Sequence, residues 1–233
     1  MLKVNPKCEV QVEFIGKSRT PIMIIDNYAD NLEEIISYAK NHEDFSPDGV
    51  SYYPGIRAKL SKDYVINTLK PLLPYLHKLY KIPQNYTPKP KNNYFSLITI
   101  PPEKLTPLQT IPHIDGTNPM RIAAIHYLGQ GDFSGTGFYR LTSSLYETID
   151  SAREDLYLHT AQTYLTTTEN KKISYCGEKN SAFMCYKKIA YKSNRLVLFP
   201  GYTLHSTLVN IDKDINADPS SGRLTANMFI DFN

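Results

Sequence analysis

The 233-residue sequence predicts a mainly β protein with additional helices, built around a barrel or a double-sheet jelly roll. From residue 92 onward, short runs of β-branched and aromatic residues alternate with turns rich in Gly, Pro, Asn and Asp. This pattern is typical of β-barrels and β-sandwiches. Before residue 92, longer segments carry apolar residues at helical spacing. We therefore expect one domain over residues 1–233, in which a helical amino-terminal part, residues 1–91, packs on a jelly-roll core, residues 92–233.

In the amino-terminal part, residues 21–26 form an apolar run typical of a strand. Asp30 is expected to cap a following helix, because Glu33 stands three residues later as in a capping box. Residues 61–82 carry apolar side chains at intervals of three and four, which predicts an amphipathic helix. Two prolines inside this segment either kink the helix or start a second one.

The composition changes at residues 83–91, which hold three prolines and few apolar side chains. Each proline lacks a backbone donor and disfavours helix in the residue before it, so we interpret this segment as a connector. Beyond it, strands are predicted at residues 94–100, 121–128, 138–141, 183–189, 195–199, 205–209 and 224–230. Looser helical spacing predicts a helix at residues 143–165.

Composition limits the kinds of partner that the protein can bind and the cellular compartment that suits it. The net charge of +3 is too small to indicate nucleic acid or an anionic membrane as the main partner. The apolar runs are far shorter than a bilayer span, and the first residues do not resemble a signal peptide. The three cysteines lack metal-site spacing and predict no disulfide framework. We expect a soluble, reduced, cytoplasmic protein, and the sequence leaves its oligomeric state open.

The most informative feature is His113-x-Asp115, with a second imidazole at His205. In an extended chain, residues i and i+2 point the same way, so one imidazole and one carboxylate project together. Two histidines and one carboxylate on one face of a metal suit non-haem Fe(II), since three positions stay open. A lone His-x-Asp is a weak signal, and solvated turn residues are its usual explanation.

Arg223 and Thr225 form a second pair at i and i+2. In a strand they share a face, and a buried guanidinium beside a hydroxyl is a good receptor for a carboxylate. The alternative is an ordinary surface arginine at a strand start, because arginine is mostly exposed in proteins.

Taken together, several segments resemble, in order, the core of the Fe(II)/2-oxoglutarate-dependent dioxygenase superfamily, and most closely its prolyl-4-hydroxylase-like branch. The segments are Pro112-His113-Ile114-Asp115, Ile125-His126-Tyr127-Leu128, Gly135-Thr136-Gly137-Phe138-Tyr139, Phe199-Pro200-Gly201-Tyr202-Thr203-Leu204-His205 and Gly222-Arg223-Leu224-Thr225. The likeness covers about residues 94–233. Tyr53-Pro54-Gly55-Ile56-Arg57 is similar to a group of bacterial members.

This resemblance implies a double-stranded β-helix, the cupin-like jelly roll of the superfamily. It implies that His113, Asp115 and His205 bind Fe(II), and that Arg223 and Thr225 hold the distal carboxylate of 2-oxoglutarate. By a weaker match, Tyr127 also reaches that carboxylate. The sequence departs from the branch in a long loop before Arg223 and in an insert at residues 142–182, and both departures bear on the substrate.

The resemblance therefore implies an oxygenase that uses Fe(II), 2-oxoglutarate and O₂ to hydroxylate an amino acid, a peptide or another small metabolite. Two alternatives stay open: a catalytically silent jelly-roll protein that binds a ligand, and a cupin-type enzyme that uses Zn²⁺ or Mn²⁺. Arg223 is unnecessary in the last case.

Other polar residues are interpreted more simply. His126 points away from Tyr127 and is expected to be a packed or surface histidine. Cys176 and Cys185 are expected to be buried thiols. Arg57 and Tyr53 either reach the mouth of the pocket or pack a turn.

Overall fold

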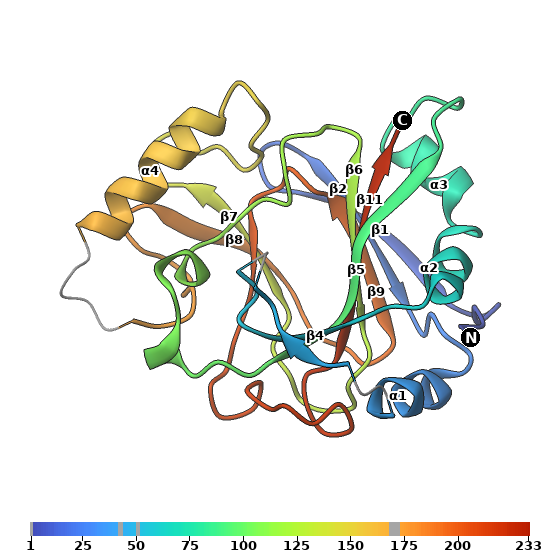
Figure 1. The fold of residues 1–233 in the computed structure, drawn as a ribbon. Coiled ribbons are helices and arrows are strands. Elements are labelled where there is room, and N and C mark those ends of the chain that lie inside the picture. Colours follow the sequence, from blue (N-terminus) through green and yellow to red (C-terminus); the bar gives the residue numbers. More distant parts are fainter. Residues whose placement is uncertain (1, 42–43, 50–51, 168–172) are drawn as a thin grey trace.

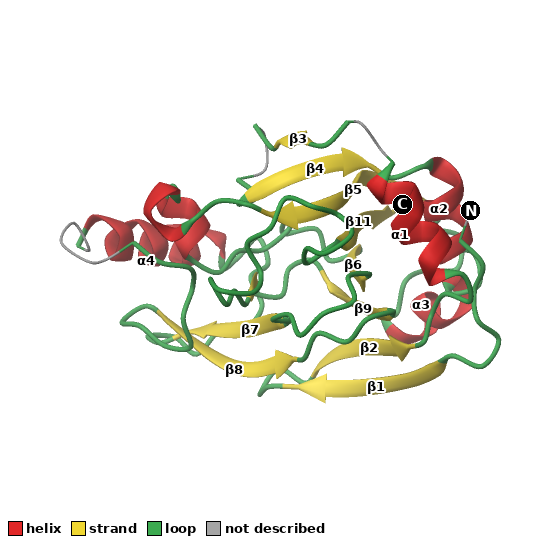
Figure 2. Cartoon of the chain, turned by 90° about the horizontal axis from the view of Figure 1, so that it is seen from below, coloured by secondary structure: helices red, strands yellow, loops and turns green. Residues whose placement is uncertain are grey.

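The computed structural model describes residues 2–41, 44–49, 52–167 and 173–233, which form two antiparallel sheets and the helices around them (Figure 1). The large sheet has the strand order β1-β2-β9-β6-β11-β5-β4-β3, and the small sheet has the order β10-β7-β8. The large sheet curves, so that β3, β4 and β5 lie across the interior from β7 and β8 (Figure 2). This is the double-stranded β-helix that the sequence predicts.

The described strands and helices have the following bounds. The strands of the large sheet are β1 (Glu9–Ile15), β2 (Thr20–Asp26), β3 (Ser46–Pro47), β4 (Gly55–Lys59), β5 (Pro88–Ile98), β6 (Arg121–Tyr127), β9 (Arg195–Pro200) and β11 (Thr225–Phe232). Those of the small sheet are β7 (Thr136–Leu141), β8 (Phe183–Ile189) and β10 (His205–Thr207). The helices are α1 (Leu32–Lys40), α2 (Lys62–Leu69), α3 (Leu73–Leu79), α4 (Glu154–Thr166) and two 3₁₀ turns, Pro102–Lys104 and Pro107–Thr110.

The two faces of the large sheet bury different residues, as the alternation along β11 illustrates. Ala226, Met228 and Ile230 point away from the space between the sheets and into the apolar core, which α1, α2 and α3 cover (Figure 1). Thr225 and Asn227 occupy the alternate positions and point into the space between the sheets. The helices therefore seal one face of the sheet, and the polar interior lies on the other.

The amino-terminal part differs from the helical unit expected for residues 1–91. Its helices are present, but β1, β2, β3 and β4 all belong to the large sheet, so this part completes the sheet as well as covering it. Sequence patterns do not indicate β1, β3 and β4 as strands, because β1 is an edge strand with little burial and β3 and β4 are short.

Several boundaries also need correction. The connector expected at residues 83–91 ends early, because β5 begins at Pro88. Of the two alternatives for the segment 61–82, the start of a second helix is confirmed, since it forms α2 and α3. Asp30 does not cap α1: Asn31 occupies that position, and its Nδ2 donates to Glu34 Oε2 (2.7 Å). The helix expected at 143–165 begins only at Glu154, within the insert at 142–182. None of the described helices is long and apolar enough to cross a membrane.

A row of paired residues crosses the large sheet and leads to the polar interior. Arg57 on β4 is opposite Ser96 on β5, which is opposite Thr225 on β11, which in turn is opposite Tyr127 on β6. Directly opposed residues share a face, so all four side chains point between the sheets. Gly55 allows β4 to lie close to β5, since a Cβ there would stand 1.9 Å from the Leu97 carbonyl oxygen.

His126 is packed on the opposite face, as expected. Its Nε2 donates to Asn194 Oδ1 (3.1 Å), and its Nδ1 accepts from the Tyr64 hydroxyl (2.7 Å), so the neutral ring is fully bonded. Burial lowers the pKa of His126 to about 4. The unfolded chain binds this proton near pH 6.5, so between pH 6.5 and about 4 protonation favours the unfolded state.

We therefore expect the free energy of unfolding to fall by roughly 3 kcal/mol between pH 7 and pH 4 on account of His126 alone. Urea denaturation of the wild type and of His126→Gln at both pH values measures it. The pH-dependent loss should be smaller in the variant by about that amount, even if the variant is less stable at pH 7. Equal losses in the two proteins would contradict the assignment.

Candidate metal centre

The three predicted ligands meet where a loop joins the small sheet. His113 and Asp115 lie in the loop between a 3₁₀ turn and β6, and His205 is the first residue of β10. The backbone N–H of His113 donates to the carbonyl of His205 (2.8 Å), and the N–H of His205 donates to the carbonyl of His113 (2.9 Å). This antiparallel bridge places the two rings side by side, with centroids 4.5 Å apart.

The ligand atoms converge on one point. Asp115 Oδ1 lies 3.8 Å from His113 Nε2, and Asp115 Oδ2 lies 3.7 Å from His205 Nε2. One ligand atom from each of the three residues can be chosen so that all lie within 4.8 Å of one another. Side chains separated by many residues in the sequence thus form one cluster.

The two imidazoles present lone pairs to this cluster. His205 Nδ1 lies 2.9 Å from the carbonyl oxygen of Thr203, which can only accept, so Nδ1 carries the proton and Nε2 is left as an acceptor. Desolvation by the surrounding protein is the main cause that lowers the pKa of His113, and the charges of His205 and Arg57 lower it further. Although 54% of the His113 side chain is exposed, each of these causes favours the neutral ring.

Asp115 is held firmly and lacks a partner for one oxygen. Its side chain is 6% exposed, and its Oδ2 is buried without a hydrogen bond from any described residue. Its backbone N–H donates to Gly201 O (2.8 Å), and its carbonyl accepts from Arg121 Nη1 (2.5 Å). Burial raises the pKa of this carboxyl group. A buried carboxylate oxygen of this kind is costly unless a cation binds it.

The donor set therefore fits a divalent transition ion. Two neutral imidazoles and one carboxylate form the donor set typical of non-haem Fe(II) sites with open positions. The hydrogen bond from His205 to Thr203 and the anchoring of Asp115 by Arg121 supply the outer contacts that orient such ligands.

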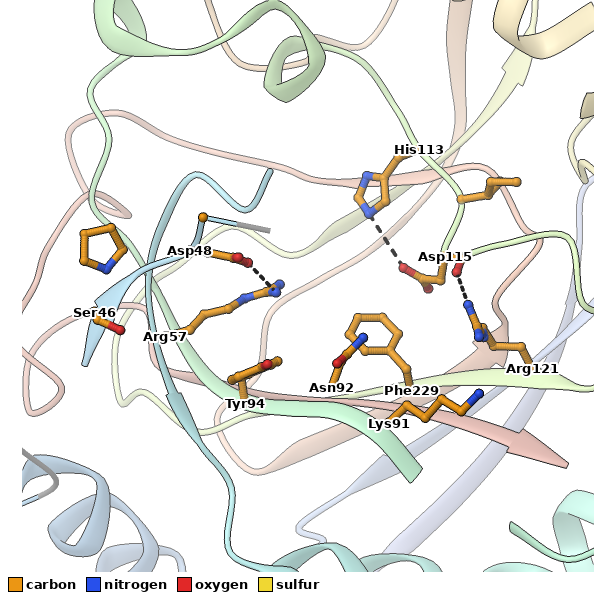
Figure 3. Close-up of a pocket in the computed structure, with 13 residues that line it drawn as sticks. Ser46, Asp48, Arg57, Lys91, Asn92, Tyr94, His113, Asp115, Arg121 and Phe229 are labelled. Atoms are coloured by element: carbon orange, nitrogen blue, oxygen red, sulfur yellow. Dashed lines mark hydrogen bonds and ion pairs between the residues drawn. The ribbon is translucent and has the colours of Figure 1, made fainter. Parts of the chain in front are cut away.

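A cavity of about 570 Å³ opens beside His113 and Asp115 (Figure 3). Arg57 and Asp48 line the side across from the ligands, and Tyr94 lies below them (Figure 3). The remaining lining residues are Ser46, Pro47, Gly49, Lys91, Asn92, Ile114, Arg121 and Phe229. The cavity gives the cluster room for a small molecule.

Arg223 is buried in the interior and lacks a counterion. It is 2% exposed, its Nε donates to Ser134 O (2.7 Å), and its Nη2 donates to Gly135 O (3.3 Å). Among the described residues, no carboxylate forms an ion pair with it. These two bonds use two of the five N–H donors of a guanidinium. A buried cation of this kind favours an anionic ligand.

The rings of Tyr127 and Tyr191 lie against this guanidinium, with 5.5 Å between Arg223 Cζ and the Tyr191 ring centroid. Thr225 is opposite Tyr127 in the sheet. Its hydroxyl accepts from Asn227 Nδ2 (3.3 Å) and donates through a long bond to Ser96 O (3.5 Å). The Tyr127 hydroxyl is already bonded to Thr136 Oγ1 (2.6 Å), so it is the Tyr127 ring that faces Arg223, with 5.8 Å between Cζ and the ring centroid.

The Tyr53 hydroxyl lies near Arg223 and Thr225 and is buried without a hydrogen bond of ordinary geometry to a described residue. The sequence leaves Tyr53 either at the mouth of the pocket or packed in a turn. Its inward position depends on how the segment before β4 packs against the sheet, which no spacing in the sequence reveals.

The chain has the double-stranded β-helix found in Fe(II)/2-oxoglutarate-dependent oxygenases, and three residues with the donor chemistry of a non-haem iron site lie together inside it. The chain belongs to DUF6445, described as a family of unknown function, whose sequence model matches residues 6–230. None of the curated proteins matches this chain.

Solved structures share the fold at low sequence identity. HygX from Streptomyces hygroscopicus, solved with nickel and 2-oxoglutarate bound, is 12% identical, with a TM-score of 0.52 over 91% of this chain and 83% of HygX. A prolyl-4-hydroxylase from Pseudomonas putida is 11% identical, with a TM-score of 0.45 over 97% of this chain and 91% of that one. At this identity, the likeness to HygX establishes the fold alone.

The geometry of Asp115 generates a test of the cluster. In metal-free protein, Asp115→Asn removes a buried charge that lacks a partner, so we expect it to raise stability by roughly 1–3 kcal/mol at pH 8. Thermal unfolding in the presence of a chelator measures this change. Added Co²⁺ should raise the melting temperature of the wild type and leave that of the variant unchanged. A destabilised metal-free variant, or equal stabilisation of both proteins by Co²⁺, would refute the role of Asp115.

Proposed function

We propose that this chain is an Fe(II)- and 2-oxoglutarate-dependent oxygenase that hydroxylates an amino acid, a peptide or another small metabolite. In this proposal His113, Asp115 and His205 hold Fe(II). Arg223, Thr225 and Tyr53 bind the distal carboxylate of 2-oxoglutarate, and the Tyr127 ring supports Arg223 from one side. When bound, the metal would couple oxidation of 2-oxoglutarate by O₂, giving succinate and CO₂, to hydroxylation of a substrate C–H bond.

The protein residues have distinct tasks. The Thr203 carbonyl fixes the His205 tautomer, so that Nε2 is available to the metal without loss of a proton. Arg121 holds the loop that carries Asp115, because it binds the Asp115 carbonyl and both oxygens of Asp231 (2.6 and 2.9 Å). The Ser134 and Gly135 carbonyls orient Arg223. The buried walls around Arg223 exclude water from the carboxylate that it receives.

The observation that carries the proposal is the buried Arg223 without a carboxylate partner, in the same interior as the metal-ligand cluster. A cupin-type Zn²⁺ or Mn²⁺ enzyme needs the three ligands but has no use for this arginine. A silent ligand-binding protein has no need of the intact set of three metal ligands. The three free cysteines support the further proposal of a reducing, cytoplasmic location.

One prediction of this proposal concerns turnover and the co-substrate. Protein with Fe(II), ascorbate and 2-oxoglutarate should release succinate, and His113→Ala should abolish the release. Arg223→Met should weaken 2-oxoglutarate binding at least about 100-fold, because two charge-assisted hydrogen bonds are lost. Arg19→Met, at an exposed turn, is the matched control and should bind normally. If the wild type neither binds metal nor consumes 2-oxoglutarate, the proposed function fails.

Another prediction distinguishes the contributions of Tyr53 and Tyr127 to 2-oxoglutarate binding. Tyr53→Phe should weaken 2-oxoglutarate binding about 5- to 30-fold, because in this proposal the Tyr53 hydroxyl donates a hydrogen bond to the carboxylate. Tyr127→Phe should have a smaller effect, since its hydroxyl is bonded to Thr136. Calorimetric titration of 2-oxoglutarate into the Zn²⁺-loaded protein compares them. A larger effect from Tyr127→Phe would reverse the assignment.

A further inference from the structure

An ion pair between Arg57 and Asp48 forms the wall of the cavity across from His113 (Figure 3). Arg57 Nη1 lies 2.7 Å from Asp48 Oδ2, and the two side chains are only 10% and 9% exposed. Arg57 is also held over the Tyr53 ring (4.2 Å) and near the Tyr94 ring (5.4 Å). Both charges are therefore fixed in position before any ligand arrives.

The second group of charges near the cavity is arranged differently. Asp231 accepts from Arg121 and lies 2.9 Å from Lys91 Nζ, but Asp231 does not itself line the cavity. Arg121 is occupied with Asp231 and with the Asp115 carbonyl. This group braces the loop of Asp115, whereas both members of the Arg57–Asp48 pair face the space that a substrate would enter.

A wall that presents a guanidinium and a carboxylate side by side selects ligands by their charge. A ligand with only a negative group meets Asp48, and a ligand with only a positive group meets Arg57, so each brings like charges together. A molecule with a carboxylate and an ammonium group on one carbon places each beside its opposite. The four charges then alternate in sign around a ring.

Part of the cavity wall offers apolar surface to the side chain of a ligand. Tyr94 lies below Arg57 and Phe229 lies below Asp115, and both rings contribute aromatic surface to the cavity (Figure 3). Ile114 is a further apolar lining residue. A side chain that extends from the ion pair toward His113 and Asp115 would cross this surface, and burial of that side chain would add affinity.

We propose that the substrate is a free α-amino acid with an aliphatic side chain, whose carboxylate binds Arg57 and whose ammonium group binds Asp48. This inference rests on the proposed function, because it places the side chain of the amino acid at the iron. It names the class of substrate, and it distinguishes a free amino acid from an internal peptide residue, which lacks both charges.

Binding is tested first without turnover. The probes are the standard L-amino acids, tested one by one against Zn²⁺-loaded protein with 2-oxoglutarate by saturation-transfer NMR. At least one aliphatic amino acid should bind, and its N-acetyl and amide derivatives should bind at least about 10-fold more weakly. Arg57→Gln and Asp48→Asn should each weaken binding of the free amino acid by a similar factor. Lys59→Gln, an exposed position on the same strand, should not.

Turnover then separates this inference from the proposed function. The amino acid that binds should raise succinate release by the Fe(II) protein at least several-fold over release without it. If 2-oxoglutarate binds and is slowly consumed, but no amino acid binds or the blocked derivatives bind equally well, this inference is refuted and the proposed function stands. If 2-oxoglutarate neither binds nor is consumed, the proposed function fails and this inference fails with it.

Discussion

The candidate site depends on one short backbone bridge, the reciprocal pair of hydrogen bonds between His113 and His205. It ties a loop that enters β6 of the large sheet to β10 of the small sheet, and it brings an imidazole from each side to the same place. Asp115, two residues further along, is turned to the same cluster by its own bond to Gly201. Without this bridge the ligands would belong to two separate sheets.

The interior accepts charges that a purely structural core would avoid. Asp115 and Arg223 are both nearly enclosed, and neither has an ordinary counterion among the described residues. Each would cost stability in a protein that bound nothing. Opposite charges in one interior suit ligands of opposite sign, a cation for the carboxylate and an anion for the guanidinium. Binding of such ligands offsets the cost of burying these charges.

Sequence reasoning recovers the parts of this protein that local patterns encode. The strand at residues 183–189 has the bounds expected from its residues, and the two-residue spacing of His113 and Asp115 places them on one side of the chain. Sequence reasoning does not place Tyr53 and Asp48 in the site. Their positions depend on the packing of short edge strands against β5, and strand register is a long-range property that composition does not carry.

The position of β11 in the large sheet has a consequence for how the molecule assembles. It is the last described strand along the chain, yet it lies between β5 and β6 and pairs with both. Until it inserts, those two strands expose unpaired edges, and Thr225 has no place in the interior. Closure of the sheet must therefore await contacts between distant segments, which favours slow folding.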